Sequence, residues 1–132
     1  MPEKELFEYA VIRVVPRVER EEFLNVGVVV YCARQKFLQA IIEPGEDRLM
    51  AFCPQCDVAE IREYLHSFRK ICEGGAGSGP IGALTVAERF RWLTAVRSTV
   101  VQCSKVHSGL TENLPETVKK LFLQLVSADR AG

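Results

Sequence analysis

Four short segments of the chain are rich in apolar and β-branched residues, which favour an extended backbone. In the first segment Ala10, Ile12 and Val14 share one face, because alternate side chains of a strand point the same way. The second segment is apolar on both faces, as in a central strand, and its Gly27 indicates a bulge or a close backbone approach. Short polar links join the first three segments, so we expect an antiparallel meander. The predicted strands cover residues 9–15, 26–32, 37–42 and 98–103.

Three other segments have apolar residues three or four positions apart, as on one face of an α-helix. The first begins at Asp57, which is followed three residues later by a glutamate in a capping-box pattern. It ends near Gly74, because glycine readily adopts the left-handed C-cap conformation. Thr85 begins the second predicted helix, and the third begins near Asn113. Between the first two helices, residues 74–82 are rich in glycine and are expected to form a flexible loop that buries nothing.

The order of these elements predicts the fold class. Three strands, two helices, a strand and a helix indicate an α+β domain, in which an antiparallel sheet of about four strands, meander first, packs against three helices. The chain has 132 residues, of which 48% are hydrophobic and 26% charged. This length and composition are typical of one globular domain, so we expect residues 1–132 to form a single domain with a glycine-rich loop at 74–82.

Charge and cysteine content narrow the classes of function. Seventeen basic and seventeen acidic residues give a formal net charge of zero, whereas a general nucleic-acid coat or a polybasic membrane anchor needs a sustained positive field. No apolar run is long enough to span a bilayer, and the charged first residues do not resemble a secretory signal. Five cysteines cannot all pair within one chain, so we expect reduced thiols. These features predict a soluble cytoplasmic protein without a cofactor, a metal or membrane contact.

Cys53 and Cys56 form a CxxC motif just before the first predicted helix. In a thioredoxin-like site the first cysteine lies at the helix N-terminus, where the helix dipole lowers its pKa. Here Asp57 is the better N-cap residue, so both cysteines precede the helix. A structural zinc ion would need two further ligands, and the sequence offers no second CxxC pair. We interpret the motif as two thiols in a loop, with redox and metal roles as alternatives.

Residues 77–82 match the pattern G-x-G-x-x-G of dinucleotide-binding sites. That site requires a strand before the glycines and a helix that opens from them. Here a predicted helix precedes the match, and Pro80 removes one of the backbone amides that would bind phosphate. We therefore interpret this segment as a linker.

The segment from Glu88 to His107 carries four arginine and lysine residues against one acid, a local formal charge of +4 − 1 = +3 with histidine neutral. Guanidinium groups, hydroxyls and an imidazole together suit a phosphate or a carboxylate. We predict an anion-binding or partner-binding edge here, although plain solvated charge is the structural alternative. His107 and Ser98 are candidate catalytic residues, as base and nucleophile of a hydrolase. The binding residues expected at this edge are Arg89, Arg91, Trp92, Arg97 and Thr99.

Two stretches of the chain together resemble a known family. The first contains Tyr-Ala-Val-Ile-Arg followed by Glu-Phe-Leu-Asn-Val-Gly-Val-Val-Val, and the second contains Glu-Arg-Phe-Arg-Trp-Leu, then Arg-Ser-Thr and Val-His-Ser-Gly. They resemble the bacterial domain-of-unknown-function family 3037, from Tyr9 to Val126. The sequence departs from that family at Cys53 and Cys56, where acidic residues are more usual.

The resemblance adds Asn25 to the candidate binding residues and implies a bacterial protein. Members of the family are often encoded beside a kinase-like protein similar to persistence toxins, which implies an accessory role. Our leading hypothesis is therefore a small module that binds a protein partner encoded nearby. The alternative is a hydrolase or nuclease that acts on a phosphate-containing substrate through His107 and Arg97. Nucleic-acid binding without catalysis is disfavoured by the zero net charge, although the local charge of +3 allows it.

Overall fold

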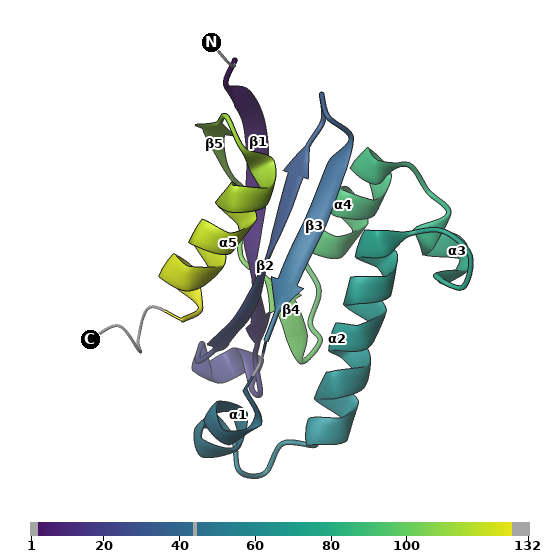
Figure 1. Cartoon of the computed structure of the whole chain (residues 1–132). Helices are drawn as coiled ribbons and strands as arrows, with labels where there is room; N and C mark the ends of the chain where they lie inside the picture. The colour runs from purple at the N-terminus through teal and green to yellow at the C-terminus, as the bar shows by residue number, and fades with distance from the viewer. Residues whose placement is uncertain (1–2, 44, 128–132) are drawn as a thin grey trace.

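A sheet of five antiparallel strands, with helices on both faces, forms the centre of the computed structural model (Figure 1). The structure describes residues 3–43 and 45–127, and for Val18 the backbone alone. The strands are β1 (Glu5–Val14), β2 (Leu24–Cys32), β3 (Phe37–Ile42), β4 (Val101–Cys103) and β5 (His107–Thr111). Their order is β3-β2-β1-β4, and β5 pairs with the first half of β1.

The predicted meander of β1, β2 and β3 is confirmed, with β2 between the other two strands. The sheet has five strands rather than the predicted four or so, and β5 is the strand that the sequence did not predict. Its residues, His-Ser-Gly-Leu-Thr, have neither the apolar alternation nor the β-branched content of a typical strand. β5 is extended because β1 offers it a ladder of backbone partners from Glu5 to Tyr9. Residues 98–100 precede β4, which is shorter than predicted.

Five α-helices and one short 3-10 turn are present in the described part of the chain. They are α1 (Glu46–Phe52), α2 (Val58–Glu73), α3 (Gly79–Gly82), α4 (Val86–Thr94), α5 (Leu114–Leu125) and the 3-10 turn η1 (Val18–Arg20). The predicted caps are confirmed: the side chains of Asp57, Thr85 and Asn113 each accept the backbone N–H three residues later. Gly74, with a φ of 70°, ends α2 as predicted. None of the helices described is long and apolar enough to cross a membrane.

Two short helices differ from the sequence prediction. α1 precedes the CxxC motif, and α3 lies inside the glycine-rich segment. Both are too short to show a clear helical period in the sequence. The expectation that residues 74–82 bury nothing is wrong, because Gly82 is buried and Ile81 packs against the core.

Side-chain alternation along the strands builds two apolar clusters on opposite faces of the sheet. On one face Ala10, Ile12 and Val14 of β1 pack with residues of α2 and α4. On the other face Val28 and Val30 of β2 pack with residues of α5. Figure 1 shows α5 alone on its side of the sheet and α2 with α4 on the other. The sheet therefore separates two surfaces that do not share side chains.

The bulge and the close backbone approach predicted from Gly27 in the central strand are both confirmed. The register between β1 and β2 shifts between Ile12 and Arg13, so Val26 forms a bulge opposite them. A Cβ atom at Gly27 would lie 2.6 Å from the carbonyl oxygen of Ile41, so no side chain fits between β2 and β3. The close approach of these two strands thus requires glycine.

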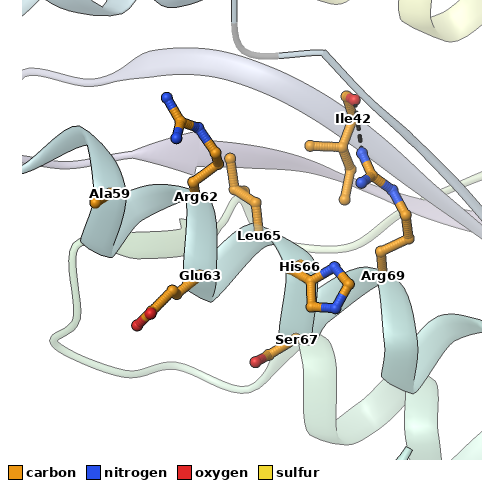
Figure 2. Close-up of a pocket in the computed structure, with 8 residues that line it drawn as sticks. All are labelled: Ile42, Ala59, Arg62, Glu63, Leu65, His66, Ser67 and Arg69. Atoms are coloured by element: carbon orange, nitrogen blue, oxygen red, sulfur yellow. Dashed lines mark hydrogen bonds between the residues drawn. The ribbon is translucent and has the colours of Figure 1, made fainter.

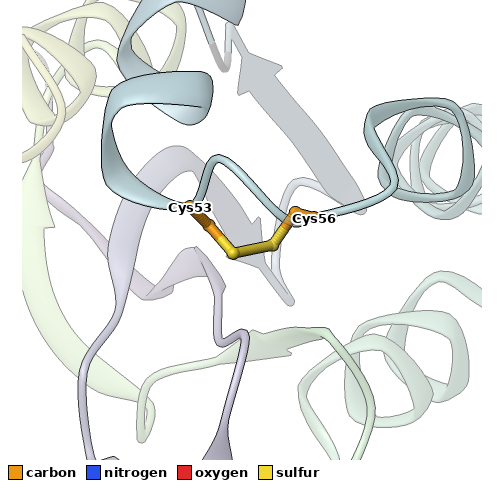
Figure 3. Close-up of a disulfide and its surroundings, with 2 residues drawn as sticks. All are labelled: Cys53 and Cys56. Carbon is orange, nitrogen blue, oxygen red and sulfur yellow. A yellow bond between two sulfur atoms is a disulfide. The ribbon is translucent and has the colours of Figure 1, made fainter.

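The structure joins Cys53 and Cys56 in a disulfide (Figure 3), which corrects the expectation of two free thiols. The turn between α1 and α2 brings their Cα atoms to 5.4 Å, within the usual range for a disulfide. Cys53 is buried and Cys56 is half-buried. Cys32, Cys72 and Cys103 are free thiols. The odd number of cysteines therefore did not exclude one local pair.

Replacing Val28 by aspartate should prevent stable folding. Val28 has no exposed surface, so the variant buries an unpaired charge and should lose more than about 3 kcal/mol of unfolding free energy. The same substitution at Val96, which is fully exposed, should change it by less than about 0.5 kcal/mol. Urea unfolding followed by circular dichroism measures both. Equal unfolding midpoints for the two variants would contradict the burial of β2.

Removing the disulfide should have a small effect on stability. It joins residues only 3 apart in the sequence, so it restricts the unfolded chain little. Cys53→Ala with Cys56→Ala should lower the unfolding free energy by about 2 kcal/mol or less. A reducing agent should shift the urea midpoint of the wild type by a similar amount and leave the double variant unchanged. A thiol titration of the unfolded, unreduced protein that finds five free thiols instead of three would contradict the disulfide.

Candidate functional site

A cavity of about 260 Å³ lies between α2, α4 and the segment that leads into β4. Its floor is formed by buried apolar residues, namely Phe68, Ile71, Leu93 and Val101. Trp92, Arg97 and Thr99 also line it, so the fold brings three residues of the predicted edge together. The remaining lining residues are Tyr64, Ser67, Gln102 and Cys103.

Aromatic and cationic side chains form the rim of this cavity. The guanidinium carbon of Arg97 lies 4.2 Å from the centre of the Trp92 ring, in a cation–π contact. Arg97 also donates a hydrogen bond to the carbonyl oxygen of Trp92, which fixes it above the indole. Trp92 is 38% exposed and Tyr64 is 42% exposed. Val96, which directly precedes Arg97 in the sequence, is fully exposed.

Hydrogen bonds within the 95–103 segment hold the other wall in place. The hydroxyl of Thr99 donates to the carbonyl oxygen of Val101 at 2.6 Å, and the amide of Gln102 donates to the carbonyl oxygen of Thr99 at 2.8 Å. Burial raises the pKa of the Cys103 thiol to about 12, although Arg97 and Arg13 oppose the shift. The thiol is therefore protonated at neutral pH and is a weak nucleophile.

Arg89 lies outside the cavity lining and caps the C-terminal end of α2. Its Nη1 donates to the carbonyl oxygens of Ile71 and Cys72, each at 2.8 Å, and its Nε donates to Leu84 at 3.2 Å. A cation here satisfies carbonyl groups that the helix leaves unpaired and complements the helix dipole. A Cβ atom at Gly74 would lie 2.6 Å from this guanidinium, so glycine also makes room for it. Arg91 and Ser98 are exposed and do not line the cavity.

Asn25 lies on β2, where its side-chain amide donates to the carbonyl oxygen of Leu125 at 3.0 Å. It is the cross-strand partner of Arg13, whose guanidinium stacks 3.9 Å from the Phe23 ring. Among the residues that the structure describes, Asn25 Oδ1 and Arg13 Nε are buried without a hydrogen-bond partner. Asn25 thus fastens the end of α5 and is not part of the Trp92 cavity.

His107 and Arg97 lie on opposite faces of the sheet. His107 pairs with Tyr9 across β5 and β1, and the two rings lie 5.3 Å apart. Tyr9 packs against the α5 cluster, whereas Arg97 lines a cavity whose floor belongs to the α2 and α4 cluster. The fold therefore does not bring His107, Ser98 and Arg97 into one pocket. In the described ranges no group of three or more His, Cys, Asp or Glu side chains could hold a metal ion.

The contribution of α2 to the cavity was not predicted from the sequence. Tyr64 and Ser67 lie three residues apart on α2 and next to the buried Phe68. Their helical spacing places them on one side of α2, but nothing in the sequence indicates that this side meets Trp92, nearly thirty residues later. Only the packing of α2 against α4 reveals it.

Arg89 should contribute to stability and Arg91 should not. Arg89→Gln leaves two carbonyl groups of α2 without a cationic donor and should cost about 1–3 kcal/mol of unfolding free energy. Arg91→Gln, a matched change two residues away on an exposed site, should cost less than about 0.5 kcal/mol. Chemical denaturation compares the two variants. Equal losses of unfolding free energy in the two variants would contradict a stabilising role of the Arg89 cap on α2.

The comparisons with known proteins agree with the motifs in the sequence. The family described as "Protein of unknown function (DUF3037)" matches residues 9–126. Searches of the curated proteins and of the solved structures found no match. The matched region includes every strand residue from Tyr9 onward, the Trp92 cavity and α5. The chain therefore belongs to the DUF3037 family of proteins of unknown function.

Proposed function

We propose that the protein is an accessory module that binds a protein partner by accepting one large apolar side chain of that partner in the Trp92 cavity. The observation that carries this proposal is the combination of an apolar floor with a Trp92, Tyr64 and Arg97 rim. Tryptophan, tyrosine and arginine are the residues most enriched at the energetic centres of protein interfaces. Their partial exposure leaves them available to a partner.

The size of the cavity favours an anchoring side chain over a cofactor. Pockets for small molecules usually enclose about 300–1,000 Å³, and this cavity encloses about 260 Å³. Val96, a fully exposed apolar residue, directly precedes Arg97 of the rim in the sequence. A protein surface would cover both features at once, whereas a small ligand would cover the cavity alone.

The chemistry of the lining also favours binding over catalysis. Among its described residues, the titratable side chains are Tyr64, Arg97 and the protonated thiol of Cys103. A hydrolase needs a base beside its nucleophile, and His107 lies across the sheet. These features support binding, and not catalysis, as the role that we propose for the cavity.

The proposal places this module in the cytoplasm of a bacterium, with the kinase-like protein implied by the family resemblance as its partner. Cys32 and Cys72 are buried free thiols, which suits a reducing compartment. Disulfides in the cytoplasm are usually transient, so cellular thiols would there reduce the Cys53–Cys56 disulfide by thiol–disulfide exchange and become disulfides themselves.

Substitutions at the rim should weaken partner binding without unfolding the protein. With the neighbouring kinase-like protein co-expressed and purified, Trp92→Ala should reduce the affinity by about 30-fold. Arg97→Lys keeps the charge but loses the planar stacking group, and should reduce it by about tenfold. Calorimetric titration measures both effects, and thermal melting confirms that the variants fold.

Two control variants locate the effect. Arg91→Lys makes the matched change outside the cavity, and His107→Ala changes a side chain on the other face of the sheet. Both should bind as the wild type does. The cavity is not the binding site if Trp92→Ala binds like the wild type, or if His107→Ala alone abolishes binding.

A further inference from the structure

β3 is the edge strand of the sheet, and its outer side has no strand partner in the described part of the chain. The backbone N–H of Glu43 donates to the carbonyl oxygen of Val26, which shows that Glu43 faces β2. Because the N–H and C=O of successive residues alternate in direction along an antiparallel strand, Ile41 and Gln39 also face β2. Ile42, Ala40 and Leu38 therefore present their backbone groups outward.

This outer edge lacks the usual protection against strand pairing. Exposed edges in natural proteins commonly carry charged side chains or proline, but β3 reads Phe-Leu-Gln-Ala-Ile-Ile. Among the described hydrogen bonds, Arg69 of α2 is the one side chain that bonds to this outer edge. Its Nη2 donates to the outward carbonyl oxygen of Ile42 at 2.9 Å (Figure 2). Leu38 and Ala40 have no such cover in the described hydrogen bonds.

A groove of about 680 Å³ lies between Ile42, at the C-terminal end of β3, and one side of α2, and Ala40 and Leu38 follow on the same edge outside its lining. Figure 2 shows Arg62, His66 and Arg69 along α2, with Arg69 reaching toward Ile42. Glu63 is the acidic residue in the lining. Arg62 forms an ion pair with Glu46 of α1. Arg69 uses one of the five N–H groups of its guanidinium in the hydrogen bond to Ile42. The lining thus holds two arginines against one glutamate, and Arg69, beside the open edge, keeps N–H groups that can donate to a ligand.

We propose that an extended acidic peptide segment of a partner protein binds in this groove by adding a strand to the outer edge of β3. Backbone hydrogen bonds to Ala40 and Leu38 would supply affinity, and side chains at alternate positions would supply specificity, as in other cases of strand addition. Every second side chain of the added strand faces α2, where Arg69, Arg62 and His66 select carboxylates. Arg69 exchanges part of its contact with Ile42 for a peptide carboxylate.

A second copy of this chain suits the edge less well than an acidic peptide. If two β3 strands paired antiparallel about a two-fold axis, the α2 helices of both copies would lie on the same face of the joined sheet, each carrying Arg62 and Arg69. Like charges placed opposite each other destabilise an interface. The groove is also separate from the Trp92 cavity, because the two sites use different sides of α2 and share Ser67 alone among their lining residues.

The test uses a fluorescein-labelled peptide of about ten residues in which Glu and Thr alternate, titrated with the 132-residue chain at low salt. We expect saturable binding by fluorescence anisotropy below about 1 mM. The same peptide with Lys in place of Glu should not bind. A version with methylated backbone nitrogens keeps the charge but cannot form the ladder, and should bind at least about tenfold more weakly.

Variants of the protein test the two parts of the site separately. Arg69→Gln should weaken binding about tenfold or more, whereas the matched Lys70→Gln on the same helix should change it less than about twofold. Ala40→Pro removes an outward N–H without breaking the ladder to β2, since proline is tolerated at a sheet edge. It should weaken binding several-fold, with the thermal midpoint measured as a check on folding.

Hydrogen exchange gives a readout that does not depend on any variant. Binding of the peptide should slow exchange of the Ala40 amide, while the Gln39 amide, already bonded to β2, should change little. The proposal is wrong if the peptide fails to bind, if the methylated peptide binds equally well, or if Arg69→Gln and Lys70→Gln have equal effects. It is also wrong if sedimentation shows a dimer that Ala40→Pro dissociates, because the edge would then belong to a second copy.

Discussion

Residues 26–32 of β2 are all buried, and their side chains alternate between two apolar clusters. Neither face of this strand reaches water, so helices must cover the sheet on both sides. The close approach at Gly27 then fixes how tightly β3 follows β2. Because β2 is buried, the surfaces left open to solvent include the outer edge of β3, the α5 side with His107, and the α2 and α4 side with Trp92.

Much of this arrangement follows from the sequence because local signals and burial agree. The β1–β2–β3 meander, the caps at Asp57, Thr85 and Asn113, and the end of α2 at Gly74 were all predictable. β5 was not, because its extended form depends on pairing with β1 and not on its own residues. The Cys53–Cys56 disulfide depends on the turn after α1, a helix too short to show a periodic pattern.

The residues of the predicted edge lie at several separate places in the structure. Trp92, Arg97 and Thr99 meet at one cavity, whereas Arg89 caps α2 and His107 lies on the far face. Neighbours in the sequence were separated because helix and sheet geometry send adjacent side chains in different directions. Tyr64 is distant from Trp92 in the sequence, but the packing of α2 against α4 brings both residues to the cavity. α2 therefore lines both the Trp92 cavity and the β3 groove, with polar residues on each of its two sides. Its Ile61, Leu65 and Phe68 side chains pack into the core between those sides.

Trp92 is the single tryptophan of the chain, and it stands at the rim of the cavity beneath Arg97. Its indole is in contact with water over part of its surface, so its emission depends on what covers that rim. The ultraviolet fluorescence of the whole protein thus originates mainly from the proposed interface. When a partner fills the cavity and displaces water from Trp92, the tryptophan emission of the unlabelled protein shifts to shorter wavelength.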